Sequence, residues 1–300
     1  PYESGLRNRY VNAGNVQNQG FEFTAGWYQQ FNENFSWSTD LNFSYNENKI
    51  VELVEPGYIT RNTSEYSDYY RNQEGYPLSQ FFGYIKLGLY KDEEDLATSP
   101  KSSTSQVGTI KFKDVNKDGV INVKDRTFIG DPNPDFLFGF TNNFKYSNFD
   151  LSISMTGSYG GKVVNALKHQ YLGNLDGAFN ILAAAKDRWR SPEQPGSGDY
   201  PRTMTGTTAE HRKVNTSWIE SNSHLAVKNI TLGYTLPLPQ NRYCSKLRVY
   251  ASIQNVCFIS KYDGANPEVS LNGLNGTGIG VDENSYPVPR VYSLGLNVTF

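Results

Sequence analysis

The chain has 300 residues, with 28 Lys and Arg against 30 Asp and Glu, so its formal net charge is −2. This balance lacks the basic footprint of a nucleic-acid-binding protein. Charged residues make up 19% of the chain and aromatic residues 14%. No stretch approaches roughly 18 consecutive apolar residues, and the mean hydropathy is −0.58, which excludes a transmembrane helix. A transmembrane β-barrel stays possible, because polar and apolar residues alternate along its strands.

The cysteine content and the start of the chain predict a fragment without a disulfide framework. Cys244 and Cys257 lie at no metal-ligand spacing from a histidine, so we expect each to fill a small apolar niche. The chain opens at Pro1 in turn-like sequence, without an initiating Met or a signal peptide. We therefore expect it to be a C-terminal piece of a longer protein.

Alternation of apolar and polar residues is the organising signal of the chain. In segment 34–46, Phe35, Trp37, Leu41 and Phe43 share one face, whereas serine, asparagine and aspartate share the other. Such a pattern is typical of a strand with one apolar side. It predicts seven strands, in chain order at residues 21–27, 34–46, 136–144, 149–156, 225–236, 247–253 and 292–300.

The fifth strand contains a phase slip. Leu225 and Val227 are followed by Ile230 and Leu232 rather than by residues in the same phase, which predicts a β-bulge near Lys228.

The connections between these strands alternate between short and long. They fall at residues 31–34, 47–133, 147, 160–223, 237–245 and 258–289. Outer-membrane barrels have short periplasmic turns and long extracellular loops, so the final strand would run inward and place Phe300 in the periplasm. A soluble sandwich or propeller would also alternate, but its strands are shorter and its loops are not sorted in this way.

The most specific local motif is a loop of the EF-hand type at residues 114–125. Its expected calcium ligands are the side chains of Asp114, Asn116 and Asp118, the backbone carbonyl of Val120, Asn122 directly or through water, and Asp125. Gly119 stands where the loop must turn sharply, and Ile121 would tie the loop to its surroundings. An Asx-turn-rich loop without an ion is the alternative. We expect a structural, weakly held Ca²⁺.

The remaining sequence features do not indicate a catalytic or metal-binding site. His169, His211 and His224 have no metal-ligand spacing, so we expect surface or loop positions for them. Residues 178–190 could form a short helix, and the acidic run 92–95 reads as a solvated turn. No phosphate-binding loop or nucleophile elbow is present, so the sequence gives no support for an enzyme.

An ordered set of motifs resembles the C-terminal part of SusC-like TonB-dependent transporters of Bacteroidetes outer membranes, the SusC/RagA type. The matching segments are residues 75–78, 82–84, 114–130, 134–136, 187–189 with 192–193, 200–202, 228–237, 254–256, 261–262, 266–268 and 296–300. The set covers nearly the whole chain from about Gly14.

The resemblance implies an all-β fold in which residues 1–300 supply about seven C-terminal strands of a 22-stranded antiparallel transmembrane β-barrel. The N-terminal plug and earlier strands would lie outside this chain. Residues 91–133 would be an extracellular loop insertion that carries the calcium loop 114–125. Residues 160–223 would be a long extracellular loop with a short helix.

The resemblance also implies a function and partners. The protein would be an outer-membrane importer of oligosaccharide or peptide cargo, energised through the TonB complex and covered by a SusD-like surface lipoprotein. Loops 55–80, 172–211 and 262–288 would face lid and cargo, and Phe300 resembles the barrel-assembly signal. The alternatives are a secreted all-β, calcium-stabilised carbohydrate-binding module and a glycoside hydrolase, which would need two carboxylates roughly 5 to 9.5 Å apart.

Overall fold

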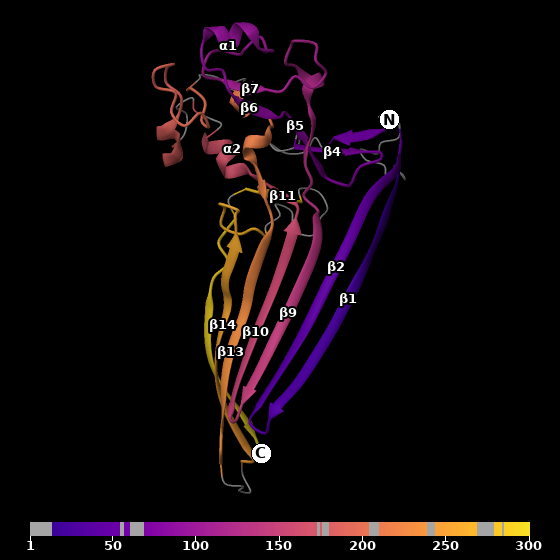
Figure 1. The fold of residues 1–300 in the computed structure, drawn as a ribbon, viewed down its shortest axis with the longest axis vertical. Coiled ribbons are helices and arrows are strands. Elements are labelled where there is room, and N and C mark those ends of the chain that lie inside the picture. The colour runs from indigo at the N-terminus through magenta and orange to yellow at the C-terminus, as the bar shows by residue number, and fades with distance from the viewer. Residues whose placement is uncertain are drawn as a thin grey trace, which may run out of the picture.

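The computed structural model describes residues 14–54, 57–60, 69–172, 175, 180–203, 210–238, 244–268, 279–283 and 285–300. Its main body is a seven-stranded antiparallel sheet in the order β1-β2-β9-β10-β13-β14-β16. Figure 1 shows these long strands side by side, with the smaller elements gathered at one end. The strands are β1 (Gly14–Asn32), β2 (Phe35–Leu53), β9 (Pro134–Tyr146), β10 (Phe149–Gly160), β13 (His224–Leu236), β14 (Lys246–Ser260) and β16 (Val291–Thr299).

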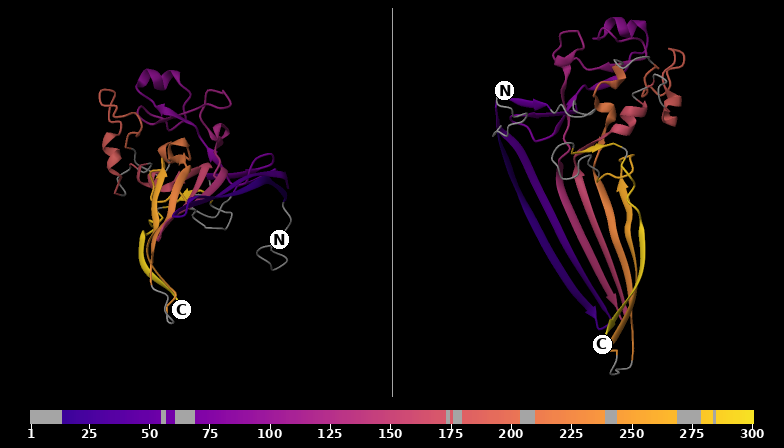
Figure 2. Two further views of the ribbon diagram at one scale, coloured as in Figure 1. Left: turned by 60° about the horizontal axis from the view of Figure 1, so that its bottom comes forward. Right: turned by 180° about the vertical axis from the view of Figure 1, so that it is seen from behind.

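All seven predicted strands are therefore present, and several are longer than predicted. β1 and β2 have 19 residues each, far above the usual five or six. Sequence neighbours pair with each other, and strands that flank a long insertion, such as β2 and β9, pair as well. The sheet is strongly curved in the views of Figure 2.

The predicted bulge in β13 is confirmed. Ser154 and Met155 are consecutive on β10, yet they pair with Asn229 and Val227 on β13, so Lys228 is the extra residue. The slip restores the phase, because Val227 and Ile230 then both face the same side of the sheet as Met155 and Ile153. β14 is also irregular at this level, because Val227 and Asn229 pair with Cys257 and Gln254. Asn255, between these two β14 residues, has a positive φ of 52°.

Connections are sorted between the two ends of the sheet. Short turns join β1 to β2 and β9 to β10, the latter through Ser147 with φ at 51°. The long insertions all leave from the opposite end, which we call the loop end, and Figure 1 shows the C-terminus at the turn end. This sorting agrees with the predicted alternation of short and long connections.

The insertions at the loop end build a head of small sheets and short helices. One sheet contains β3 (Tyr58–Thr60), β4 (Tyr70–Gln73), β5 (Gln80–Gly83) and β8 (Thr127–Gly130); a second contains β6 (Lys86–Leu89) and β7 (Ile110–Phe112); a third contains β12 (Ile219–Ser221), β11 (Lys162–Asn165) and β15 (Val281–Asp282). The helices are α1 (Glu93–Thr98), α2 (Ala166–Leu172) and the 3₁₀ turns η3 (Val123–Asp125), η4 (Ala183–Asp187), η5 (Glu210–Arg212) and η6 (Thr216–Trp218).

The head, rather than the long sheet, holds the buried core. One cluster includes Phe81, Val164 and Trp218, and a second includes Ile110, Ile121 and Trp189. The long sheet is a single layer, and its large apolar residues are exposed on one side.

Three expectations about individual segments are wrong. Within the described part of segment 178–190, the helical element is the 3₁₀ turn η4, whose N-cap Leu182 makes no side-chain cap hydrogen bond; the α-helix lies at α2 instead. Cys257 is exposed, because it stands on the apolar outer side of β14 opposite Val227. His169 and His211 are buried inside the head, where His169 Nε2 lies 3.1 Å from the carbonyl oxygen of Arg212.

Candidate functional site

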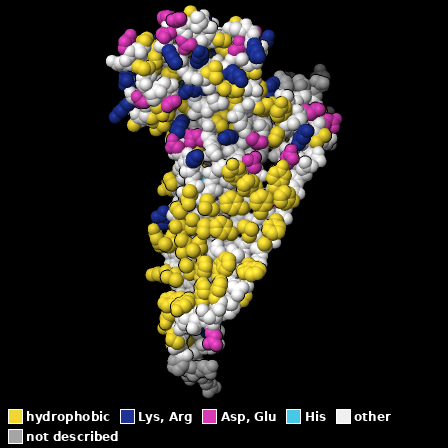
Figure 3. Space-filling model, in the orientation of Figure 1, with side chains coloured by type: hydrophobic (Ala, Val, Ile, Leu, Met, Phe, Trp, Pro, Cys, Tyr) yellow, Lys and Arg dark blue, Asp and Glu magenta, His cyan; other side chains and the backbone are white. Residues whose placement is uncertain are grey.

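One side of the long sheet is a continuous apolar surface. We call it the outward side, and we call the opposite, polar side the inward side. Directly paired residues share a face, so the registers of all seven strands fix which side chains lie together. One row across β9, β10, β13 and β14 contains Phe144, Leu151, Leu232 and Ala251. Figure 3 shows apolar side chains covering the middle of the sheet, whereas charged side chains gather at the head above it.

Aromatic rings mark the upper border of this surface. Phe21 stacks on Tyr45 with ring centroids 5.6 Å apart. Phe43 stacks on Phe136 at 5.3 Å, and Phe136 stacks on Tyr159 at 5.0 Å. These contacts form an aromatic line across four strands near the loop end.

A second aromatic level lies near the turn end. It includes Phe31 against Phe35 at 5.2 Å and Phe149 against Tyr234 at 4.7 Å. Along β1, the segment from Phe21 to Phe31 spans about 33 Å at roughly 3.3 Å per residue. Tilted by about 40°, it would cover a height of about 25 Å, the height of the apolar band of an outer-membrane barrel. The two levels resemble the aromatic girdles that flank the apolar band of an outer-membrane barrel.

The inward side of the same sheet is polar. Thr24 Oγ1 donates to Asn42 Oδ1 at 3.1 Å on β1 and β2. Near the turn end, Arg248 Nε donates to Asp150 Oδ1 at 2.8 Å, and Arg248 Nη2 donates to Asp150 Oδ2. This bidentate ion pair spans β13. Gly233 leaves the room for this guanidinium, because a Cβ there would lie 2.4 Å from Arg248 Nη2.

Polar contacts at the loop end tie segments together that are far apart in sequence. Lys168 Nζ on α2 lies 2.9 Å from Glu220 Oε1 and also pairs with Asp263. Burial lowers the pKa of Lys168, but the hydrogen bonds to Asp263 and Glu220 outweigh it and raise the pKa overall. Nearby, Tyr262 Oη donates to Asp282 Oδ2 at 2.6 Å, and burial followed by this bond raises the pKa of Tyr262.

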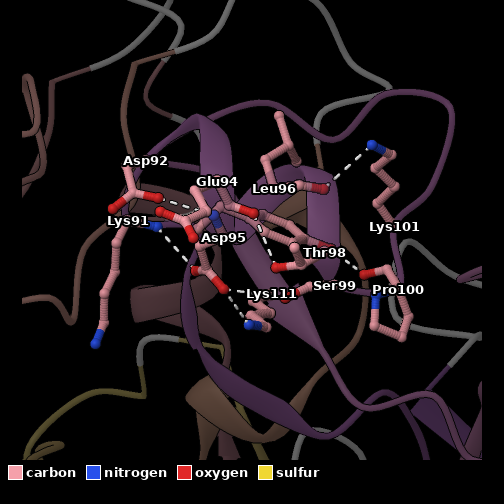
Figure 4. Close-up of polar contacts among 11 residues, drawn as sticks. Lys91, Asp92, Glu94, Asp95, Leu96, Thr98, Ser99, Pro100, Lys101 and Lys111 are labelled. Carbon is pink, nitrogen blue, oxygen red and sulfur yellow. Dashed lines mark hydrogen bonds and ion pairs between the residues drawn. The ribbon is translucent and has the colours of Figure 1, made fainter.

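The acidic run 92–95 is part of a small capped helix rather than a free turn (Figure 4). Asp92 Oδ1 accepts from the Asp95 N–H at 2.8 Å, and Asp95 Oδ1 accepts from Lys111 Nζ at 2.5 Å. Although burial acts in the opposite direction, the hydrogen bonds from Lys111 and from the Lys91 N–H lower the pKa of Asp95. These carboxylates therefore hold α1 onto β7.

The predicted calcium loop adopts a tight, internally bonded conformation. Asp114 Oδ2 accepts from the Gly119 N–H at 2.8 Å, and Gly119 has a positive φ of 83°. Asp125 is fully buried, with Oδ1 accepting from the Val115 N–H at 3.0 Å. Ile121 packs into the second head cluster, as the sequence predicted.

The other proposed ligands lie in the same loop. Asn116 Nδ2 donates to Asp118 Oδ2 at 2.9 Å, and Asn122 Nδ2 donates to the Val120 carbonyl at 3.2 Å. All donor atoms in the set are hard oxygens, which fits Ca²⁺. Within the described residues, no three His, Cys, Asp or Glu side chains converge as a metal-binding group, so binding would require these side chains to exchange internal hydrogen bonds for the ion.

Sequence reasoning missed the cluster around Lys168, and parts of the expected cargo loops lie outside the described residues. Lys168, Glu220 and Asp263 lie more than forty residues apart from one another in sequence, so no local pattern could group them. In loops 55–80, 172–211 and 262–288, the following residues lie outside the described part of the chain: 55–56, 61–68, 173–174, 176–179, 204–209, 269–278 and 284.

No helix in the described part is long and apolar enough to cross a membrane.

No family model matches the chain, but named relatives cover it. It is 32% identical to the TonB-dependent receptor P3 and 33% identical to the TonB-dependent receptor P26, both of Formosa agariphila, over 100% of the chain. It is 27% identical to the TonB-dependent receptor SusC of Bacteroides thetaiotaomicron over 96% of the chain. The chain is homologous to SusC-like TonB-dependent receptors. It spans about 30% of the length of the first two relatives.

Solved structures agree on the fold of this SusC-like segment. It matches the RagAB peptide transporter with a TM-score of 0.79 and 20% identity, covering 100% of this chain and 31% of that chain. The closed state of the RagAB peptide importer matches with a TM-score of 0.76 and 21% identity. The predicted fold is confirmed: the sheet is all-β and antiparallel, and it matches part of a transporter barrel.

Proposed function

We propose that this SusC-like segment forms part of the wall of an outer-membrane, TonB-dependent nutrient importer. The outward apolar surface between the two aromatic levels carries this proposal, because it is too large and continuous to face water. The polar inward side would line the lumen. Import would then be a conformational process, in which no bond of the cargo is made or broken.

Partners and cargo follow from the relatives. A SusD-like surface lipoprotein would cover the head, and the TonB complex would supply energy through a part of the receptor outside this chain. The cargo class is oligosaccharide or peptide; the RagAB relative is named as a peptide transporter. The head carries the long insertions, so it is the surface on which lid and cargo would act.

We include Ca²⁺ in the proposal as a structural ion in loop 114–125. The ligands would be Asp114, Asn116, Asp118, Asn122 and Asp125 side chains with the Val120 carbonyl, and their oxygen chemistry supports this. The ion would stiffen the loop against the cluster that contains Ile121. Phe300, 90% exposed next to β16, would serve in barrel assembly.

The secreted carbohydrate-binding module is the weaker alternative. Such a module would bury its apolar strand faces against a second layer, whereas the large apolar side chains of the sheet, including Trp27 and Leu294, are 62% and 88% exposed. The homology to TonB-dependent receptors also favours the importer.

Membrane fractionation of cells that produce the native polypeptide tests the proposal, combined with uptake of labelled oligosaccharides and labelled peptides. We expect the protein in the outer membrane and expect uptake to stop when the TonB complex is de-energised. A cargo that still enters at the same rate without energy would contradict TonB dependence. A protein found only in the soluble fraction would overturn the membrane assignment itself.

A further inference from the structure

A cavity of about 840 Å³ lies where the apolar outward surface meets the head. On the strand side its lining includes Phe136, Phe138, Tyr159 and Ile259. These residues belong to the outward rows of β9, β10 and β14. We call this cavity the rim pocket, because it begins at the upper aromatic level and opens above it.

The head side of the rim pocket is polar and carries free charges. Lys162 and Lys261 line it and are exposed. Among the residues that the structure describes, neither ammonium group has an ion-pair or hydrogen-bond partner. Lys261 directly follows the last residue of β14 and stands two residues after Ile259.

Acidic groups and hydroxyls complete the lining. Asp135 is exposed and likewise has no partner among the described residues, whereas Asp131 Oδ1 accepts from the backbone N–H and the side-chain amide of Asn133, both at 2.8 Å. Ser221 and Ser223 add hydroxyl groups. The pocket thus offers two ammonium groups, two carboxylates and serine hydroxyls above an aromatic floor.

We infer that the rim pocket binds the phosphate-bearing headgroup of a lipid in the leaflet that surrounds the loop end. This inference rests on the proposed function. The pocket is continuous with the lipid-facing surface, which favours a lipid as the ligand. A bound lipid would place its apolar chains beside Phe138 and Ile259. Its polar group would lie beside Lys162 and Lys261. Tyr159, 56% exposed, has the amphipathic character that sits at headgroup level.

The two lysines would take the phosphate oxygens, because an ammonium at the membrane surface attracts anionic lipid. The Asp135 carboxylate would accept hydrogen bonds from the rest of the headgroup, and the serine hydroxyls would donate or accept them. A free phosphate ion would contact only the two exposed lysines and leave the aromatic floor uncovered, so we expect it to bind too weakly to stabilise the protein.

The test uses the full-length receptor that contains this chain, purified in a neutral detergent. Its thermal unfolding is followed while phosphatidic acid, phosphatidylcholine or inorganic phosphate is added. We expect phosphatidic acid to raise the Tm, phosphatidylcholine to raise it less, and inorganic phosphate to leave it unchanged. In the variant with both Lys162→Gln and Lys261→Gln, we expect at least a tenfold weaker response to phosphatidic acid.

Matched variants keep the test decisive. Lys113→Gln with Lys186→Gln removes two exposed head lysines outside the rim pocket and should respond like the wild type. Lys162→Arg with Lys261→Arg keeps the charge and should retain the preference, which separates loss of charge from loss of folding. An unchanged response of the Gln variant, or equal protection by inorganic phosphate, would overturn the inference. A receptor that never enters the membrane would instead overturn the proposed function.

Discussion

At the scale of single residues, a glycine at position 20 leaves no room for a side chain between strands β1 and β2. Gly20 pairs with Asn46, and a Cβ at Gly20 would lie 2.1 Å from the Tyr45 carbonyl oxygen. The neighbouring backbones could accept a side chain there only by moving apart. Gly139, also on the inward side, has no such restriction, because its nearest contact would be 3.6 Å.

We predict that Gly20→Ala destabilises the folded barrel by about 1–3 kcal/mol, the usual cost of overpacking. Gly139→Ala, the same change on the same side of the sheet, should be neutral or slightly stabilising. The temperature at which the receptor loses its compact form in gel electrophoresis measures both. Equal behaviour of the two variants would show that the close approach at Gly20 is not limiting.

The calcium loop gives a second prediction at this scale. Hydrogen bonds from the Val120 N–H and then from the Asn116 amide lower the pKa of Asp118, so its carboxylate is ionised at neutral pH and available to a cation. We predict that chelator increases proteolytic cleavage within 114–125 several-fold in the wild type. Asp118→Ala should cleave rapidly with or without chelator, whereas the exposed acid variant Glu93→Ala should match the wild type. Chelator-independent cleavage of the wild type would argue against the ion.

At the scale of elements, the bulge at Lys228 keeps β13 in phase with its neighbours. Deleting one residue from a regular strand moves every following side chain to the other face. We predict that deletion of Thr231, within the regular ladder, abolishes barrel assembly. Deletion of Lys228 should retain assembly, because Leu225, Val227 and the following apolar residues then alternate without a slip. The folded fraction in the outer membrane measures both, and equal loss would contradict this role of the bulge.

The same bulge residue helps to fasten the loop that follows β14. Glu268 Oε2 lies 2.5 Å from Lys228 Nζ, and Glu268 Oε1 lies 3.5 Å from His224 Nε2. The hydrogen bond with His224, followed by that with Lys228, lowers the pKa of Glu268 below its ordinary value of 4.5, against the effect of burial. A carboxyl group whose pKa is lower in the folded state stabilises that state above the unfolded pKa.

We therefore predict that the attachment of segment 261–268 is complete above pH 4.5, the ordinary value, and is lost as the pH falls through the lowered value. Hydrogen exchange of this segment measures the effect. Glu268→Gln should exchange rapidly at all pH values, and the exposed variant Glu94→Gln should follow the wild type. If Glu268→Gln kept the wild-type pH dependence, another group would hold the segment.

At the scale of the whole molecule, the two sides of the sheet should tolerate charge differently. Ile153 faces outward between the aromatic levels, where it pairs with Ile230, whereas the next residue, Ser154, faces inward beside Thr141. We predict that Ile153→Lys lowers the stability of the membrane-embedded protein by about 2–4 kcal/mol and that Ser154→Lys is tolerated. Denaturant unfolding in lipid vesicles measures both, and tolerance of Ile153→Lys would contradict a lipid-facing surface.

Much of the barrel wall could be predicted from local pattern, but the contacts of the head could not. Period-two alternation is set by strand geometry alone. The spacing of Phe35 and Phe43 was therefore enough to predict that they share one face of the sheet. His169 and Cys257 were misplaced because burial depends on what packs against a residue, and their neighbours come from distant segments. The predicted helix in 178–190 failed for a related reason: in short insertions, tertiary contacts outweigh propensity.

The sequence by itself determined the strands, their inward and outward faces, the bulge at Lys228 and the sorting of turns and loops, because each follows from residues adjacent in the chain. Only the tertiary structure decided which loops meet in the head, where Lys168 joins Glu220 and Asp263. It also decided that Lys162 and Lys261 both line the rim pocket above the upper aromatic level. Such juxtapositions depend on the curvature of the sheet and on the packing of long insertions, which no local pattern encodes.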